Sequence, residues 1–582
     1  MAAVSLPSSE SLRTTLSTTS ARTRRAASGS VPATAARSFI TAATRDTSVF
    51  SVGVTCVLSA AASFWRRTRS RSSSCFSVAR RYSMGGRAVV SSRTRAMTDR
   101  IRFILDGQVK ELERVDPTQT VLQWLRGVEN RCGTKEGCAE GDCGACTVVL
   151  GELRGDEVRY RAVNACILFV PALDGKAVLT VESLCRRGED LHPVQQAMVD
   201  CHASQCGFCT PGFVMSLVAL YESEPAPSRA RIDEVLAGNL CRCTGYRPIV
   251  AAAREAWARG GGPRLAAQTA GMVELLRSIR RRETLALEHG GRRWFSPVTV
   301  DALAELLERH PGARIVAGGT DVGVWVTKQH VEIETAVSVA SIPELADIVE
   351  TPTHLEIGAA ATYTDAYGPL AARWPDLGEL LRRLGSQQIR NAATLGGNVA
   401  NASPVGDATP ALLALDATLV LRRGAAQREV PLDGFFLGYR RTALRPGEFL
   451  EKIRVPQPAP GRLFRAYKVS KRFDQDISAV CGALSVELDG GRVADVRLAY
   501  GGVAETPWRA RGCEAALRGR PWTEATVDAA LGALDAELRP ISDLRASAAY
   551  RRAVARNLLR KFQLETAGRG VPLRLAASGE GA

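Results

Sequence analysis

The sequence predicts a multidomain α+β protein. Its 582 residues are long enough for about three or four domains, and a hydrophobic content of 45% is that of a globular chain. Both strand-like and helix-like segments occur along the chain, and a Gly-rich breaker at 260–263 divides it. Eight of the fifteen cysteines fall into two spaced sets, which indicates two metal centres in series.

The two cysteine sets have different spacings. The first set is C-x4-C-x2-C-x19-C and the second is C-x2-C-x31-C-x-C, and their members are Cys138, Cys143, Cys146 and Cys166, then Cys206, Cys209, Cys241 and Cys243. The first spacing begins like the plant-type ferredoxin run that holds a [2Fe–2S] cluster, and we predict an iron–sulfur cluster for each set. A structural zinc site also takes four thiolates, and a zinc-binding scaffold therefore stays as an alternative. Against it, neither set includes a histidine, and the first set lies in a Gly-rich loop whose N–H groups can surround sulfides.

Residues 98–180 are predicted to form a ferredoxin-like β-grasp domain. Alternation over 101–105, the Asp106-Gly107 turn and a return strand over 108–115 indicate a hairpin. A short helix, the cysteine loop and strands over 147–150 and 159–165 follow. Cys132 lies outside the spacing and is interpreted as a packed free thiol.

Residues 181–258 are predicted to form a four-helix bundle around the second cysteine set. The helices are expected over 193–201, 212–221, 232–237 and 248–257, where apolar residues recur with the helical period. The cysteines precede two of these helices, whose N-termini carry partial positive charge that stabilises a negative cluster.

A linker over 259–290 contains the Gly260–Pro263 breaker, and residues 291–456 are predicted to be an α/β domain. In this domain a strand over 314–317 runs into Gly318-Gly319, which can bring N–H groups to a pyrophosphate. A second glycine loop includes Gly396-Gly397, and no G-x-G-x-x-G fingerprint occurs in the chain. Residues 457–570 are expected to form a small α+β domain, with 571–582 as a tail.

Several motifs carry a resemblance to a known family. E-G-C-A-E-G-D-C-G-A-C at 136–146, Q-C-G-F-C-T-P-G at 205–212 and G-N-L-C-R-C-T-G-Y at 238–246 resemble the iron–sulfur domains of the molybdenum hydroxylases, the xanthine dehydrogenase and aldehyde oxidase family. The two glycine loops together resemble the family's FAD-binding domain. The resemblance implies a PCMH-type fold for 291–456 and a domain like the C-terminal domain of the CO dehydrogenase flavoprotein for 457–570.

The same resemblance implies cofactor-binding residues. The first loop would hold the FAD diphosphate, and the second loop would hold the phosphate and ribityl side. Asp407 and Ile477 would complete the pocket, and Leu384 stands where many members have an aromatic ring. Gln205 would contact the molybdopterin of a partner subunit. The loop residues are Ile315, Val316, Ala317, Gly318, Gly319, Thr320, Asp321 and Val322, then Thr394, Leu395, Gly396, Gly397 and Asn398.

The resemblance implies an electron-transfer subunit with no catalytic residue for substrate hydroxylation. Electrons would pass from a large molybdopterin-binding subunit through the second and first clusters to FAD and then to NAD+, in a heterotetramer. The fused order of iron–sulfur, iron–sulfur and flavin domains favours the xanthine branch, with oxidation of a purine. An iron–sulfur/flavin subunit of an aldehyde, CO or N-heterocycle dehydrogenase is the alternative, and a lone flavoprotein that oxidises NAD(P)H is a further one.

Residues 1–97 are predicted to be a disordered extension. Its first 96 residues hold fifteen Arg against Glu10 and Asp46, which accounts for most of the net charge of +16, so we expect no nucleic-acid partner. An over-extended gene start before Met97 is favoured over a transit peptide or a signal or membrane segment at 47–65. Because the free cysteines show no pairing pattern, a reducing, cytoplasmic location without a membrane is expected.

Overall fold

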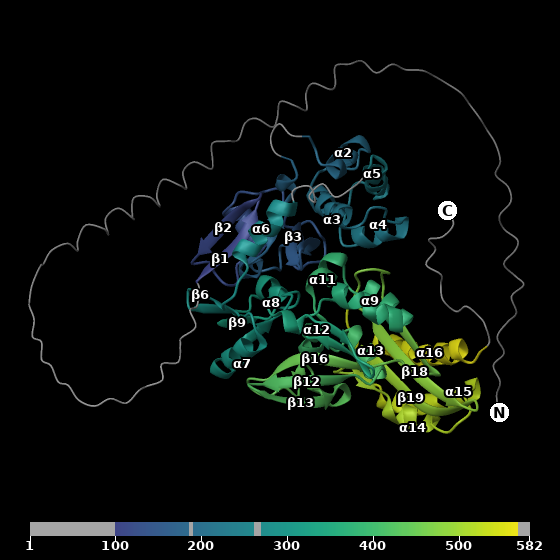
Figure 1. The fold of residues 1–582 in the computed structure, drawn as a ribbon. Helices are drawn as coiled ribbons and strands as arrows, with labels where there is room; N and C mark the ends of the chain where they lie inside the picture. Colours follow the sequence, from purple (N-terminus) through teal and green to yellow (C-terminus); the bar gives the residue numbers. More distant parts are fainter. Residues whose placement is uncertain (1–98, 186–189, 261–268, 569–582) are drawn as a thin grey trace, which may run out of the picture. The chain divides into compact units, whose positions relative to one another are not determined.

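The computed structural model describes residues 99–185, 190–260 and 269–568, which lie in one compact unit (Figure 1). The predictions for residues 1–97 and 571–582, and for Gly261–Pro263 of the linker, lie outside these ranges. In the described ranges, no helix is long and apolar enough to cross a membrane.

The first domain is a five-stranded sheet in the order β2-β1-β5-β3-β4. The predicted hairpin is present, and β5 joins it in parallel between β1 and β3. Trp124 of α1 packs edge-to-face on Phe103 of β1, with ring centroids 5.2 Å apart. This arrangement is the expected β-grasp. The elements are β1 (Arg100–Leu105), β2 (Gln108–Glu113), α1 (Val121–Gly127), β3 (Thr147–Arg154), β4 (Glu157–Asn164), η1 (Val170–Leu173), β5 (Ala177–Leu179) and η2 (Val181–Ser183).

The second domain consists of four helices around an apolar core that includes Phe213, Leu217 and Ala253. Two of its helices begin close after cysteines, since α3 has Cys209 as its N-cap and α5 begins at Arg247, four residues after Cys243. The helices are α2 (Pro193–Asp200), α3 (Thr210–Ser223), α4 (Arg229–Leu236) and α5 (Arg247–Ala258). The predicted four-helix bundle is thus confirmed.

A helix and a small sheet continue the chain. The helix α6 (Thr269–Ile279) packs Leu276 and Ile279 onto Ile104 of the first domain. The sheet has the order β6-β7-β9-β8, with β9 parallel to both of its neighbours. β6 lies within the range predicted as linker. The elements of this part are β6 (Leu285–His289), β7 (Arg292–Ser296), α7 (Val300–Arg309), β8 (Arg314–Val316), α8 (Val322–Gln329) and β9 (Thr335–Ser338).

The rest of this α/β domain is built on an antiparallel sheet in the order β10-β11-β16-β12-β13. Helices α9 to α13 supply much of its core, including Leu370, Leu381 and Leu412. The elements are η4 (Pro343–Leu345), β10 (Ile348–Glu350), β11 (His354–Gly358), α9 (Tyr363–Arg373), α10 (Pro375–Arg382), α11 (Gln387–Ala392), α12 (Leu395–Asn401), α13 (Ala408–Ala414), β12 (Thr418–Arg423), β13 (Ala426–Pro431), η5 (Leu432–Gly434), β14 (Phe436–Gly438), β15 (Arg441–Thr442) and β16 (Phe449–Pro456).

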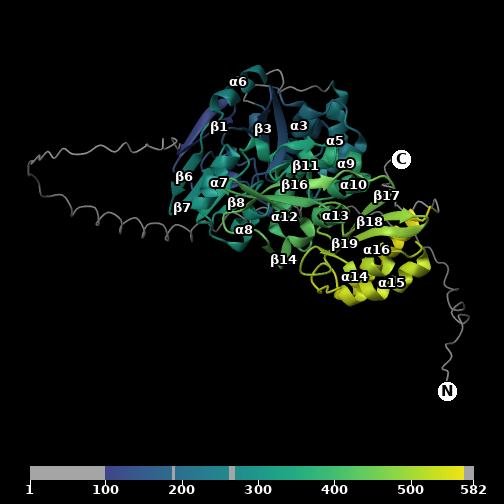
Figure 2. The same cartoon turned by 60° about the horizontal axis from the view of Figure 1, so that its bottom comes forward.

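The last domain is an antiparallel sheet, β17-β18-β19-β20, covered by three helices (Figure 2). The Arg-rich helix α16 directs one of its arginines inward, because Arg551 is 1% exposed and binds two backbone carbonyl groups. The elements are β17 (Arg462–Val469), β18 (Val480–Asp489), β19 (Arg492–Gly501), β20 (Trp508–Arg509), α14 (Arg511–Leu517), α15 (Glu524–Glu537) and α16 (Ala548–Thr566).

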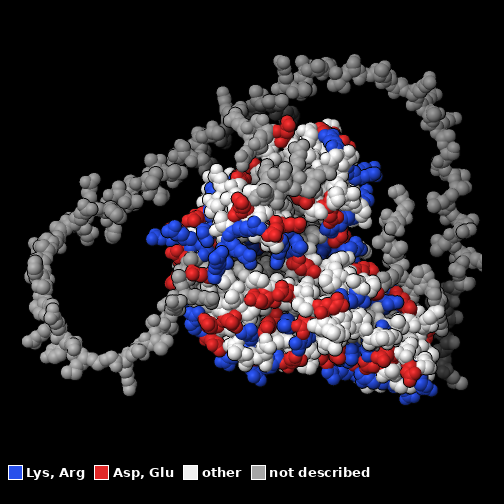
Figure 3. Space-filling view, in the orientation of Figure 1, with Lys and Arg blue, Asp and Glu red and all other residues white. Residues whose placement is uncertain are grey.

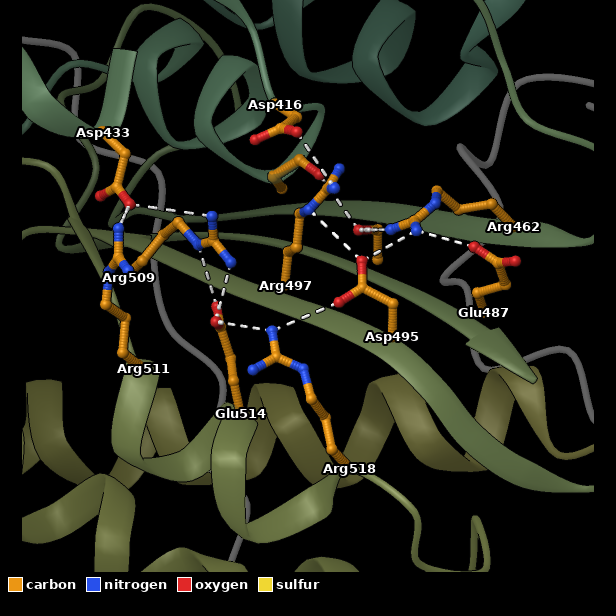
Figure 4. A network of polar contacts seen from close by, with 12 residues as sticks. Asp416, Asp433, Arg462, Glu487, Asp495, Arg497, Arg509, Arg511, Glu514 and Arg518 are labelled. Carbon is orange, nitrogen blue, oxygen red and sulfur yellow. Dashed lines mark hydrogen bonds and ion pairs between the residues drawn. The ribbon is translucent and has the colours of Figure 1, made fainter. Parts of the chain in front are cut away.

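An ion-pair network joins this last domain to the α/β domain before it (Figure 4). Asp416 of the α/β domain pairs with Arg497 at 3.1 Å, and Asp433 pairs with Arg511. On the face drawn in Figure 3, acidic and basic side chains are interspersed over much of the surface, as such pairing requires.

Candidate cluster and flavin sites

The first cysteine set gathers in the loop between α1 and β3 and at the end of β4. Cys138 is hydrogen-bonded to Cys143 and Cys166, and Cys166 is hydrogen-bonded to Cys146, so the four thiols are contiguous. These contacts, first of all the one from Cys143, lower the pKa of Cys138.

Backbone N–H groups also surround the Cys138 sulfur. The amides of Glu140, Asp142 and Cys143 donate to Sγ at 3.4, 3.3 and 3.4 Å. Gly141, with φ +80°, lets the loop turn around the sulfur. Amide donors directed at thiolates stabilise negative charge, so the loop fits an anionic cluster.

The second cysteine set forms two pairs. Cys206 and Cys243 lie 3.2 Å apart between their sulfur atoms, and Cys209 is hydrogen-bonded to Cys241. Burial raises the pKa of Cys209 to about 12, and the contact with Cys241 acts in the same direction. Cys206 and Cys243 are exposed, whereas Cys146 and Cys166 of the first set are buried.

No three His, Cys, Asp or Glu side chains in the described ranges converge on a point as ligands of a single ion would. A [2Fe–2S] cluster is bound differently, because its four cysteines are divided between two irons that share the sulfides. The two thiol pairs of the second set fit that division, and the four contiguous thiols of the first set are close enough to share one cluster.

The first cysteine set adjoins the first glycine loop. The residue after Cys166, Ile167, presents its carbonyl to Gly323, where a Cβ atom would overlap it. Thr327 Oγ1 on α8 donates to Ala139 O at 2.7 Å, next to Cys138. The helix α8, which follows the loop predicted for the flavin diphosphate, is thus in contact with the segments that hold two of the four thiols, and Gly319 of the loop itself lies next to the Ile167 carbonyl.

The two glycine loops meet each other. A Cβ atom on Gly318 would overlap the Ala392 carbonyl, so only glycine allows this approach. Thr394 caps α12 by accepting a hydrogen bond from Gly397 N at 3.0 Å. Gly397 itself is exposed, which leaves the start of α12 open to a ligand.

Unpartnered polar atoms lie behind the loops. Asn398 Oδ1 and Tyr363 Oη are buried without a hydrogen-bond partner in the protein. Burial, and then Asp407 and Asp321, raise the pKa of Tyr363 well above its usual value. Because buried polar groups are normally satisfied, these atoms fit a bound polar cofactor such as FAD.

Asp407 is the centre of a buried network. Lys468 Nζ lies 2.5 Å from its Oδ2, and Ser478 Oγ donates to its Oδ1 at 2.5 Å. Sequence reasoning did not single out Lys468. A lysine in a strand is usually solvated, and only its burial opposite Asp407 marks it.

For three of the expected site residues, no contact among the described residues supports the expected role. Leu384 packs in the core at 9% exposure, Ile477 is 45% exposed, and Gln205 is exposed beside the second cysteine set. The roles expected for them remain predictions. Cys132 is also exposed, and its prediction as a packed thiol is wrong, because it lies in the open turn after α1.

Four family models match consecutive parts of the chain. They are the 2Fe-2S iron-sulfur cluster binding domain at 103–171, the [2Fe-2S] binding domain at 180–254, the FAD binding domain in molybdopterin dehydrogenase at 287–458, and the CO dehydrogenase flavoprotein C-terminal domain at 465–566.

Curated relatives cover the same part of the chain. Xanthine dehydrogenase of Emericella nidulans is 36% identical over 81% of this chain and 39% of its own length. Xanthine dehydrogenase/oxidase of Gallus gallus is 32% identical over 80% and 40%, and aldehyde oxidase 2 of Macaca fascicularis is 34% identical over 81% and 39%. The chain thus spans about two fifths of the length of these relatives. Among solved structures, a carbon monoxide dehydrogenase from Hydrogenophaga pseudoflava aligns with 46% of this chain and 94% of its own, at 32% identity and a TM-score of 0.44.

Proposed function

Because this chain belongs to the molybdenum hydroxylase family, of which it carries the iron–sulfur and FAD-binding domains, we propose that it passes electrons from a molybdopterin-binding partner to NAD+. When bound, the two [2Fe–2S] clusters supply one-electron transfer, and FAD supplies the step from single electrons to hydride transfer. The protein provides order, spacing and insulation.

The observation that carries this proposal is that the second cysteine set lies nearer the protein surface than the first set, which adjoins the flavin domain. The second cysteine set has two exposed members, and the first set is partly buried and contacts the first glycine loop through Ile167. A partner that docks over the second set would reach one end of the series, and FAD would lie at the other end.

The surface around the second cysteine set supports such a partner. Phe208 is 47% exposed, Leu240 41% and Tyr246 40%, all within five residues of a cysteine of this set. Clustered exposed apolar side chains mark interaction surfaces. We propose that this surface binds the molybdopterin subunit, with Gln205 directed at the pterin, in a heterotetramer.

In the proposed sites each group has a role. The eight cysteines would hold the clusters, and the Cys138 loop would stabilise their charge through its N–H groups. The two glycine loops would hold the FAD phosphates, and Asn398 would present its unpartnered oxygen to the cofactor. Lys468 would hold the carboxylate of Asp407 in place through their ion pair.

We propose xanthine as the substrate of the complete enzyme. The names of the Emericella and Gallus relatives support this choice, as does the fusion of the iron–sulfur and flavin domains in one chain. The similarity to aldehyde oxidase 2 makes an aldehyde the second candidate, with CO or an N-heterocycle as further ones.

The test is to purify the chain with a tag under anaerobic conditions and measure iron, sulfide, zinc and flavin. We expect four irons and one FAD per chain, two distinct paramagnetic signals on reduction, and a molybdenum-containing partner in the same complex. The complex should then reduce NAD+ with xanthine but not with an aldehyde, CO or quinoline. Zinc without flavin would overturn the redox function, whereas turnover of another substrate would overturn only the choice of xanthine.

A further inference from the structure

A short helix of the flavin domain binds both iron–sulfur domains. On α11, Asn391 Nδ2 donates to Ala162 O of the first domain at 2.9 Å, and Arg390 pairs with Glu234 of the second domain at 2.7 Å. On the same helix, Gln388 is 1% exposed. Its side chain points to the place where the two cysteine loops touch.

At this place a backbone hydrogen bond and a side-chain hydrogen bond join the two cysteine loops. Leu240 N donates to Cys143 O at 3.0 Å, and Leu240 immediately precedes Cys241. A residue of each thiol set is therefore connected through one hydrogen bond and a single peptide link. Asn239, the next residue back, donates from Nδ2 to Gly144 O at 3.0 Å.

Glycines bring the backbones into direct contact here. A Cβ atom on Gly144 would overlap Gly238 O, and one on Gly212 would overlap Gly144 O. A Cβ atom on Gly238 would overlap Gln388 Oε1. We call this contact between the two cysteine loops, at Cys143–Gly144 and Gly238–Leu240, the seam. The side chain of Gln388 packs against one side of it.

The orientation of the buried amides follows from Gly144. Its carbonyl can only accept, so Asn239 presents Nδ2 to it and turns Oδ1 the other way. Ser216 Oγ donates to that Oδ1 at 2.7 Å, and Gln388 Nε2 donates to it at 3.0 Å and to Ser216 Oγ at 2.9 Å. This arrangement satisfies Asn239 Oδ1 with two donors and leaves Gln388 Oε1 without a partner in the described residues, and Gln388 is the donor from the flavin domain.

We propose that Gln388 is a positioning residue for electron transfer between the two clusters: its amide fixes Asn239 and thereby the Leu240–Cys143 hydrogen bond that joins the cysteine loops. The inference rests on the proposed function, because it assumes a cluster in each set. It deepens that function by assigning the alignment of the clusters to the flavin domain. Removing the amide would free Asn239 to turn and would let the two loops shift relative to each other.

The test compares Gln388→Met with Gln387→Met in the full chain loaded with iron and sulfide. Met keeps the length of Gln388 but has no donor. Gln387 lies on the same helix, and its side chain binds Arg231, Arg390 and Asn391. In the described residues it makes no hydrogen bond to Asn239 or Ser216. The readout is the magnetic interaction between the two reduced clusters in the electron paramagnetic resonance spectrum, which depends on their distance and relative orientation.

We expect Gln388→Met to keep the iron content of the wild type and to shift the splitting due to this interaction, while Gln387→Met leaves it unchanged. Ser216→Ala, which removes the other donor to Asn239, should shift it in the same way, and it decides the matter if Gln388→Met loses iron. An unchanged splitting in the Gln388 and Ser216 variants, or an equal shift in the Gln387 control, would overturn the positioning role. A wild-type chain that shows no pair of cluster signals would instead overturn the proposed function.

Discussion

At the scale of single residues, we expect the ion pair of Lys468 and Asp407 to contribute strongly to the stability of the fold. The side chains of both are almost inaccessible, at 1% and 7% exposure, and Ser478 takes up the second carboxylate oxygen. A buried charge without its partner costs far more than an exposed one, because water no longer solvates it. The pair also links β17 of the last domain to the start of α13, so it couples that domain to the flavin site.

We predict that Lys468→Met destabilises the protein by about 3–5 kcal/mol and lowers its FAD content, because Asp407 is left as an unpaired buried charge. Chemical unfolding and the flavin absorbance of the purified protein measure the two effects. Adding Asp407→Asn should restore much of the lost stability, since the uncompensated charge is then gone. If the double variant is no more stable than Lys468→Met, the pair is not the cause.

At the scale of elements, the network in Figure 4 joins β19, β20 and α14. Glu514 is its buried member, accepting from Leu498 N at 2.8 Å and pairing with Arg509 at 2.8 Å. Glu487 is the exposed member of the network: its side chain is 42% exposed, and it pairs with Arg462 at 2.8 Å. The network therefore contains the same kind of contact, an Arg–Glu ion pair, once with a buried glutamate and once with an exposed one.

We predict that Glu514→Gln lowers the free energy of unfolding by about 3–5 kcal/mol, because it removes the buried carboxylate 2.8 Å from the Arg509 guanidinium and leaves only the longer contact with Asp433 at 3.8 Å. The matched change Glu487→Gln should cost at most about 1 kcal/mol, since water screens that pair. Urea unfolding of both variants measures the difference. Equal losses would show that depth does not determine the strength of these pairs.

The contact between β4 and α9 predicts a pH dependence. Although burial works to raise it, the hydrogen bond and charge of Arg161 lower the pKa of Asp365 from 3.8 to about 2. A carboxyl group with a lowered folded-state pKa contributes stability above its unfolded-state pKa and loses it as the pH falls toward the folded-state value.

We therefore predict that Asp365→Asn is less stable than the wild type at pH 7, by at most about 2.6 kcal/mol for a shift of this size. The difference should be constant down to about pH 5 and should shrink below about pH 4. Unfolding free energies of both proteins across this range provide the measurement. A difference that does not depend on pH would mean that the charge of Asp365 contributes nothing.

At the scale of the whole molecule, the two cysteine sets lie at different depths. Cys206 and Cys243 are open to solvent, whereas Cys146 and Cys166 are buried beneath the β-grasp core and the flavin domain. A series that begins at the surface and ends inside is suited to accept electrons from another chain and to protect them from stray oxidants.

We predict that a soluble iron chelator removes the second cluster well before the first in the chain purified alone, because only the second cysteine set has fully exposed members. The two cluster signals, followed over time after adding the chelator, give the two rates. Cys243→Ser should abolish the second signal and leave the first, which assigns the signals. Loss of both clusters at one rate would contradict the depth order.

The sequence by itself determined the chemistry and most of the local structure. Thiol identity and short-range spacing indicate the clusters, and the strand alternation and helical period predicted the β-grasp hairpin and the bundle, because these signals act over a few residues. The glycine loops likewise follow from local backbone requirements.

Only the tertiary structure decided which groups meet and at what depth. The pairing of Cys206 with Cys243, the burial of Lys468 against Asp407 and the insertion of β5 beside β1 join residues that are distant in sequence. Nothing in the sequence around Gln388 indicates its role, and only the fold brings its side chain into contact with Asn239 of the second cysteine loop. Such contacts depend on the packing of the whole chain, because burial and long-range pairing are set by every element that surrounds a residue rather than by its neighbours in sequence.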